Sequence, residues 1–253
     1  MTQAEKRKST AGRSIAIVGS KPDSVMPDCD IIYFVNGSII LFQDQLGNGK
    51  EIFNVINGNS IRNYDRIERY QASGAPVGTL ISNMHKFKYS RFVLYNTEEN
   101  DSVNILLDLG IQPKNIRVIT RGERDTILKK ITGYNMPLGT LNALRELSLY
   151  EFARLTYAGI LKRNVYKKKD FSPYLRPSTG MFAVLFAIDE YGFDYRYEIS
   201  GISFERRDTY KVNKKVVQTD MENKINLQWH IIPDRKVVRK LLKNKELDLL
   251  IHK

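Results

Sequence analysis

The chain has 253 residues, of which 42% are hydrophobic and 27% charged, and this composition excludes an intrinsically disordered protein. The formal net charge of +12 predicts an anionic partner, for which nucleic acid, an acidic membrane surface and a phosphorylated or carboxylated substrate are all candidates. Cys29 is the only cysteine, so no internal disulfide can form.

Residues 1–13, MTQAEKRKSTAGR, are basic and polar, and they predict a flexible arm rather than a signal peptide, which needs an apolar core. No apolar run in the sequence approaches the roughly 20 residues of a membrane span. We therefore expect a cytoplasmic protein. No linker rich in Pro, Gly or Ser divides the rest of the chain, so residues 14–253 are expected to form a single domain.

Short β-branched runs alternate with helical patterns along the chain. The runs predict strands at 14–19, 30–36, 51–57, 91–96, 115–120, 195–200 and 247–252. Apolar residues at helical spacing predict helices at 101–110, 138–163, 181–192 and 234–245. The polar stretch 203–228 predicts a long active-site loop. Together these elements predict an α/β, Rossmann-like fold with a mostly parallel central sheet and helices on both faces.

Two of the predicted strands end in residues that suit ligand binding, and ligands of an open parallel sheet bind at the carboxyl ends of its strands. Gly19 follows the first strand and allows a close backbone approach, and Ser20 adds a hydroxyl group. Asn36 follows the second strand, and its carboxamide can both donate and accept hydrogen bonds. The first turn lacks G-x-G-x-x-G spacing, so we expect no dinucleotide site. Ordinary turn residues are the alternative interpretation.

The stretch RPSTG at 176–180 opens a predicted buried helix. Pro177 suits the first turn of a helix, and Ser178 and Thr179 place hydroxyl groups beside its free N–H groups. That end of a helix attracts phosphate through its amides and its macrodipole. An ordinary helix N-cap is the competing interpretation.

His230 is a general-base candidate, because it stands in a predicted loop just before a basic helix. A surface or half-buried histidine is the alternative. Asp28 and Asp30 form an Asp-x-Asp like that of metal-dependent glycosyltransferases. However, they precede a strand, so we interpret them as a turn and expect no metal site. One cysteine cannot build a zinc thiolate cluster.

Three stretches, taken in order, resemble the sialyl motifs of glycosyltransferase family 29. Residues 13–38, with VGS and a second strand ending in Asn, resemble the large motif. Residues 176–204, with Pro-Ser-Thr-Gly, an apolar helix and a strand ending in Gly, closely resemble the small motif. Residues 229–241 resemble the very small motif, in which a histidine precedes a charged helix.

The resemblance implies a metal-independent enzyme, with a GT-A-variant sialyltransferase-like fold and no cofactor, that binds a CMP-activated sugar acid. It implies that His230 deprotonates the acceptor hydroxyl and that the sugar inverts at its anomeric carbon. The residues that the resemblance places at the nucleotide are Gly19, Ser20, Asn36, Pro177, Ser178, Thr179, Gly180 and Gly201.

The sequence also departs from the family pattern. Ser14 stands about where animal members carry a disulfide cysteine, and Ser20 replaces the Asn of the first turn. The His-x4-Glu of the family becomes His230 and Asp234, with three residues between them. The missing cysteines and membrane anchor point to a bacterial, cytoplasmic relative that builds surface glycans such as lipopolysaccharide or capsule.

The donor and the acceptor stay open at this point. Sialic acid and Kdo, both 3-deoxy-ulosonic acids, share an anomeric carboxylate and the CMP leaving group, so either fits the same site. The acceptor is expected to be a hydroxyl group of a glycan or glycolipid. A retaining CMP-Kdo transferase with a carboxylate nucleophile, Asp208, Asp220 or Asp234, is an alternative.

Two further interpretations of the function follow from the positive net charge. A nucleic-acid-binding module is one, but no helix-turn-helix, RNA-recognition or zinc-finger pattern supports it, so nucleic acid is not the favoured partner. A peripheral contact of residues 235–245 with an anionic membrane, at its inner face, is the other. In that contact, headgroups would meet Arg239 and Lys240, and the lipid would meet Val238, Leu241 and Leu242.

Overall fold

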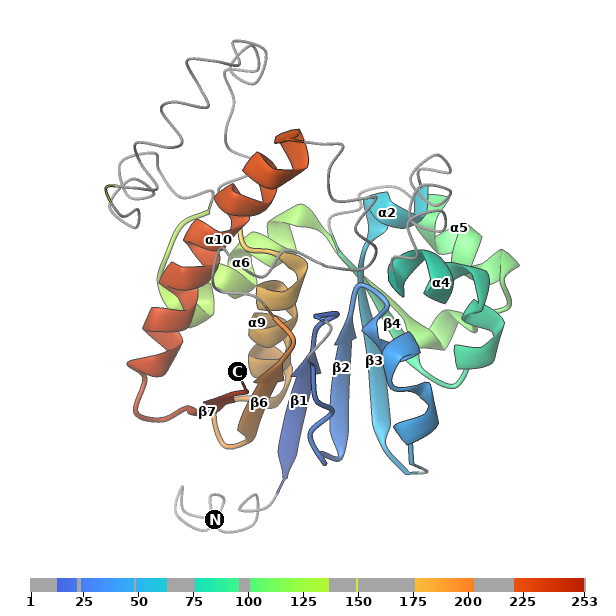
Figure 1. Ribbon diagram of the computed structural model, residues 1–253, viewed down its shortest axis with the longest axis horizontal. Helices are drawn as coiled ribbons and strands as arrows, with labels where there is room; N and C mark the ends of the chain where they lie inside the picture. Colours follow the sequence, from blue (N-terminus) through green and yellow to red (C-terminus); the bar gives the residue numbers. More distant parts are fainter. Residues whose placement is uncertain are drawn as a thin grey trace.

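The computed structural model of the protein describes residues 13–21, 24–47, 49–62, 76–95, 101–136, 176–202 and 221–252, with the single residue Leu149 (Figure 1). Within these ranges, the side chains of Asn59, Arg62 and residues 221–231 are not described. The predicted arm (up to residue 12), the predicted helix at 138–163 apart from Leu149, and residues 203–220 of the predicted loop lie outside the described residues.

The described residues form one seven-stranded sheet, and every strand in it is parallel to its neighbours. Each strand falls within a run that the sequence predicts. β2 is buried at every position, as expected for a strand covered on both faces. The strands are β1 (Ser14–Val18), β2 (Ile31–Val35), β3 (Glu51–Asn57), β4 (Arg91–Tyr95), β5 (Ile116–Ile119), β6 (Arg196–Ser200) and β7 (Asp248–Ile251).

The strand order β5-β4-β3-β2-β1-β6-β7 places a topological switch point beside β1. The chain steps in one direction from β1 to β5, and then returns to the other side of β1 with β6. In an open parallel sheet, ligands bind outside the carboxyl ends of the strands at such a reversal. The turns that follow β1 and β6 therefore mark the place to look for a functional site.

Helices cover both faces of the sheet, which confirms the predicted α/β, Rossmann-like architecture (Figure 1). Among the described residues, three helices pack on one face: α6 (Arg121–Thr132), α9 (Thr179–Tyr191) and α10 (Met221–Leu242). The other face is covered by α2 (Gly58–Arg62), α4 (Pro76–Ser82), α5 (Asp101–Asp108) and the short 3₁₀ helices η1 (Ser38–Leu41) and η3 (Met84–Phe87). Two more 3₁₀ helices, η2 (Gln43–Gln45) and η4 (Pro113–Asn115), lie in connections.

The most deeply buried helix is α9, in which every residue from 179 to 188 is buried. It packs on β1, β2 and β3, where Phe186 contacts Tyr33 edge to face. A helix that is apolar all round belongs in a core. Because α9 leads through a short connection into the parallel strand β6, its N-terminus lies at the carboxyl edge of the sheet.

The structure corrects the predicted start of the last helix. α10 begins at Met221, so residues 221–228, predicted as part of a loop, are helical, and His230 lies within the helix rather than in a loop ahead of it. Pro233 also lies inside α10. Proline and polar residues are typical of loops, and this local signal explains the wrong prediction.

Helix α6 was not predicted from the sequence. Its residues are mostly polar, which hides the apolar spacing. The N-cap Thr120 accepts a hydrogen bond from the backbone N–H of Glu123, at 3.2 Å, and Gly133 ends the helix in a left-handed conformation. The Thr-x-x-Glu spacing is that of a capping box and was the available signal.

The apolar residues near the end of α10 mostly face the protein core. Leu241 is 2% exposed and Val238 is also buried, so the prediction that these two side chains would meet lipid is wrong. Leu242, in contrast, is 56% exposed, as expected from the helical period, because its side chain points away from that of Leu241. No helix among the described residues is long and apolar enough to cross a membrane.

Candidate functional site

The turns after β1 and β6 pack directly against each other at the switch point. The backbone N–H of Gly19 donates to the carbonyl of Ser200 at 2.8 Å. A Cβ atom at Gly19 would lie 2.1 Å from the carbonyl oxygen of Gly201, which has a positive φ of 66°. The close approach predicted for Gly19 is therefore made by another part of the same chain, and both glycines are required by packing.

The side chain of Ile202 joins the first turn to the start of α9. A Cβ atom at Gly19 would lie 3.1 Å from Ile202 Cγ1, and one at Gly180 would lie 3.0 Å from Ile202 Cγ2. The predicted site residues Gly19, Gly180 and Gly201 are thus brought together around this side chain. Ser20, next to Gly19, is buried.

Asn36 follows β2 at the same edge of the sheet. Its backbone is in the left-handed region, with φ 51°, and its N–H donates to Val55 at 3.0 Å. Its half-buried side chain has no hydrogen bond to the described residues. Ser38 fixes this turn, because its hydroxyl accepts from the N–H of Val35 and donates to the carbonyl of Val18 at 2.6 Å. Asn36 therefore stands beside the end of β1 with its carboxamide available.

Ser178 is the N-cap of α9, and its Oγ accepts a hydrogen bond from the N–H of Met181 at 3.3 Å. The N-cap interpretation of RPSTG is thus correct for Ser178. Pro177 precedes the cap, so the prediction that it lies in the first turn is wrong. The cap itself has a second partner, because the N–H of Ser178 donates to Oδ1 of Asp234 at 2.8 Å.

Asp234 brings a carboxyl group from α10 to the N-terminus of α9. Its side chain is 1% exposed. Burial raises its pKa to about 7, and the hydrogen bonds from the Ser178 side chain and backbone act in the opposite direction. No cationic side chain among the described residues contributes to lowering it. The carboxyl group can therefore change its charge near neutral pH.

Tyr95 ends β4 and reaches the first turn of α9. Its hydroxyl lies 2.5 Å from Oγ1 of Thr179, and both residues are buried. Burial raises the pKa of Tyr95 to about 12, against the hydrogen bonds of Thr179 and Asn57 and the charge of Arg124, so the phenol stays protonated at neutral pH. The ends of β3 and β4 thus share a polar cluster with the start of α9.

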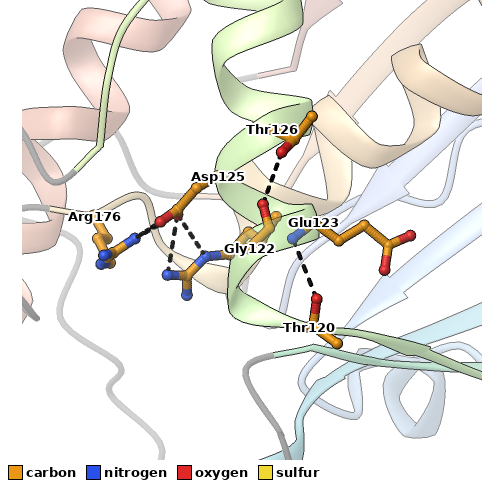
Figure 2. A network of polar contacts seen from close by, with 7 residues as sticks. Thr120, Gly122, Glu123, Asp125, Thr126 and Arg176 are labelled. Carbon is orange, nitrogen blue, oxygen red and sulfur yellow. Dashed lines mark hydrogen bonds and ion pairs between the residues drawn. The ribbon is translucent and has the colours of Figure 1, made fainter.

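Two arginines converge on Asp125 next to this cluster (Figure 2). Arg176, two residues before the N-cap, donates from Nη1 to both carboxylate oxygens, with 2.6 Å to Oδ2. Nη2 of Arg124 lies 3.3 Å from Oδ1 of the same carboxylate. Arg124 is 4% exposed, and burial and then the charge of Arg176 lower its pKa. Two guanidinium groups therefore stand beside the N-terminus of α9.

Tyr95, Asn57 and Arg124 were not predicted from the sequence. Asn57 ends one predicted strand and Tyr95 is the second-last residue of another, so the rule that ligands bind at carboxyl ends could have found them. Arg124 is on the unpredicted helix α6. The side chain of His230 lies outside the described residues, so its catalytic role stays a prediction. Its backbone lies one turn of α10 before Asp234.

The Asp28 and Asp30 pair precedes β2, at the opposite edge of the sheet, as the sequence indicated. Asp28 pairs with Lys50 at 2.7 Å, and the carbonyl of Asp30 accepts from the N–H of Glu51. Within the described ranges, no group of three or more His, Cys, Asp or Glu residues could hold a metal ion.

Fold and site together define a Rossmann-like α/β protein with a buried polar cluster at the carboxyl edge of its sheet. No protein-family model, curated protein or solved structure matches the chain.

Proposed function

We propose that this protein is a glycosyltransferase that moves a 3-deoxy-ulosonic acid, sialic acid or Kdo, from its CMP-activated donor to a hydroxyl group of a surface-glycan or lipid-linked acceptor. One observation carries the proposal. The three stretches that resemble sialyl motifs are separate in sequence, and their described parts adjoin at the carboxyl edge of the sheet.

Two contacts bring the three stretches next to one another. The first and second stretches meet where Ile202 lies against Gly19 and Gly180. The second and third meet where the N–H of Ser178 donates to Asp234, 56 residues away. An accidental likeness of three short stretches would not require them to adjoin at the switch point, where α/β proteins bind nucleotides.

In the proposed reaction, the acceptor oxygen attacks the anomeric carbon while the bond from that carbon to the CMP phosphate breaks. His230 takes the proton of the acceptor hydroxyl, and the electron pair of the broken bond leaves with the phosphate. The N-terminus of α9 supports the leaving phosphate with its amides and dipole. Arg124 and Arg176 share the carboxylate of Asp125, and together the three groups leave one net positive charge beside that position. Displacement in one step inverts the anomeric carbon.

The buried position of Asp234 argues against the retaining alternative through this residue. A nucleophile must reach the anomeric carbon, whereas this carboxyl group is 1% exposed and bound to the amide of Ser178. Asp208 and Asp220 lie outside the described residues. The inverting reaction with a histidine base is therefore the one that we propose.

Ligand-induced shifts of the melting temperature test which nucleotide the protein binds. We expect CMP and CMP-sugars to raise the melting temperature, since they bind only the native state, and we expect UDP and GDP to raise it much less. A donor screen of CMP-sialic acid against CMP-Kdo, with NMR of the anomeric configuration of the product, then identifies the sugar. Equal shifts for all three nucleotides, or a salt-dependent response to RNA or DNA alone, would contradict the proposal.

A pair of N-cap variants distinguishes an effect on CMP binding from an effect on the stability of the protein. Ser178→Ala and Thr120→Ala each remove the side-chain cap of a helix, α9 and α6 respectively, and each should cost about 1 kcal/mol of unfolding free energy. We expect only Ser178→Ala to weaken CMP binding, by roughly tenfold, because it alone alters the proposed phosphate site. Equal CMP affinity in both variants would remove Ser178 from that site.

A further inference from the structure

The carboxyl group of Asp234 occupies the end of α9 where the proposed function needs an anion. Its Oδ1 accepts from the N–H of the N-cap Ser178 at 2.8 Å, and its side chain is almost completely buried. A donor phosphate at the N–H groups of Thr179 and Gly180 would be a close neighbour of this carboxyl group. Two negative charges so close in a buried place repel each other strongly, because little water screens them.

The described cationic groups offset this repulsion only in part, and none of them contributes to lowering the pKa of Asp234. From β4, Tyr95 is protonated at neutral pH. From α6, Arg124 is paired with Asp125, and Arg176, just before α9, is paired with the same carboxylate, so the two guanidinium groups leave one net positive charge there. The first turn of α9 has no acidic residue, and its residues 179–182 are uncharged. On α10 itself, Arg235 and Lys236 follow Asp234 and are half-buried, and the side chain of His230 is not described.

We propose that Asp234 is a positioning residue of the nucleotide site, which holds the amide of Ser178 throughout and takes up one proton from solvent when the donor phosphate binds. The inference rests on the proposed function. The hydrogen bond survives the change, because the carbonyl oxygen of a protonated carboxyl group still accepts from an N–H. The proton removes the charge that would oppose the phosphate, while α10 stays fixed to α9.

The carboxyl group of Asp234 can gain or lose a proton near pH 7 already in the protein without a bound nucleotide. Near pH 7 this group, whose pKa burial raises to about 7, exists in both charge states. A bound phosphate favours the neutral state further, since a neighbouring like charge raises the pKa of a carboxyl group. Proton uptake at pH 7 should then approach about half a proton per CMP and should grow toward one as the pH rises to about 8.

Isothermal titration of the full chain with CMP, at pH 7 and 8 in buffers of different ionisation enthalpy, measures this proton balance. The phosphate of CMP itself titrates near pH 6, and binding of its dianion releases protons, which is the opposite sign. We expect net uptake for the wild type and none, or a small release, for Asp234→Asn. The matched control is Asp189→Asn near the other end of α9, where the carboxylate pairs with Lys130 at 2.6 Å. This control should keep the uptake of the wild type.

The outcomes separate the two proposals. If the wild type does not bind CMP, the proposed function fails and the inference fails with it. If the wild type binds CMP but takes up no more protons than Asp234→Asn, the inference alone is overturned. Should Asp234→Asn not fold, His230→Ala decides instead, since uptake that persists at pH 8 without this histidine supports Asp234, and zero uptake or release there rejects it.

Discussion

The hydroxyl group of Tyr95 lies 2.5 Å from that of Thr179, so the end of β4 is joined directly to the first turn of α9. The two residues are 84 positions apart in the sequence. Their contact, the Ser178–Asp234 hydrogen bond and the Asp125 cluster all lie around the start of one helix. The N-terminus of α9 is therefore held by polar groups from β4 and α10, and the cluster of Asp125, Arg124 and Arg176 lies beside it.

We expect Tyr95→Phe to lower the free energy of unfolding by about 1–2 kcal/mol, because the buried hydroxyl of Thr179 loses its partner. Urea denaturation measures the loss. Tyr89→Phe is the control, since Tyr89 is well exposed, and this variant should stay within about 0.5 kcal/mol of the wild type. An equal effect of the two changes would mean that the Tyr95 contact contributes nothing specific.

Gly19→Ala should destabilise the protein by at least about 3 kcal/mol, because the new Cβ atom would lie 2.1 Å from the backbone oxygen of Gly201. Gly122→Ala is the matched control inside α6, where a Cβ atom has open space. That variant should gain roughly 0.5–1 kcal/mol, since alanine favours a helix more than glycine does. Thermal melts of both proteins check the opposite signs, and a stable Gly19→Ala protein would disprove the close contact.

Leu241→Ala and Leu242→Ala should differ strongly although the residues are adjacent. Leu241 is buried, so its loss leaves a cavity and should cost about 2–4 kcal/mol. Leu242 is mostly exposed, and its loss should cost less than about 0.5 kcal/mol. Chemical denaturation compares the two variants. Similar values would indicate that this end of α10 does not pack on the sheet as described.

The free energy of unfolding should depend on pH in part through the titration of Asp234. Its folded-state pKa of about 7 lies well above the ordinary aspartate pKa of 3.8, so the folded state holds the proton more tightly than the unfolded state does. The contribution of Asp234 to stability is thus most favourable below about pH 4, declines as the pH rises to about 7, and then stays constant. A tenfold difference in proton affinity between the two states corresponds to roughly 1.4 kcal/mol.

Urea denaturation of the wild type and of Asp234→Asn between pH 4 and 8 measures this effect. The difference between the two proteins isolates Asp234 from the other carboxyl groups. We expect the Asn variant to gain stability relative to the wild type as the pH rises, by a few kcal/mol in order of magnitude. A difference that does not vary with pH would show that Asp234 has an ordinary pKa in the folded protein.

The strands of this protein could be predicted from the sequence because their signal is local. β3 spans residues 51–57, as its run of apolar residues indicated, and a parallel strand buried on both faces needs just such a run. The position of Gly19 and Asn36 at the ends of strands follows from the same runs. Helix α6 and the first half of α10 escaped prediction because polar residues and Pro233 hide their period.

The contacts of the site were decided by the tertiary structure. Nothing in the stretch around residue 234 indicates that its carboxyl group caps the amide of Ser178, 56 residues earlier, or that burial shifts its pKa. Likewise, the sequence indicated that Gly19 leaves space for a ligand, whereas in the structure the backbone of Gly201 occupies that space. Local sequence sets which backbone each segment prefers, whereas the partners of a polar group depend on which distant segments the packed core brings beside it.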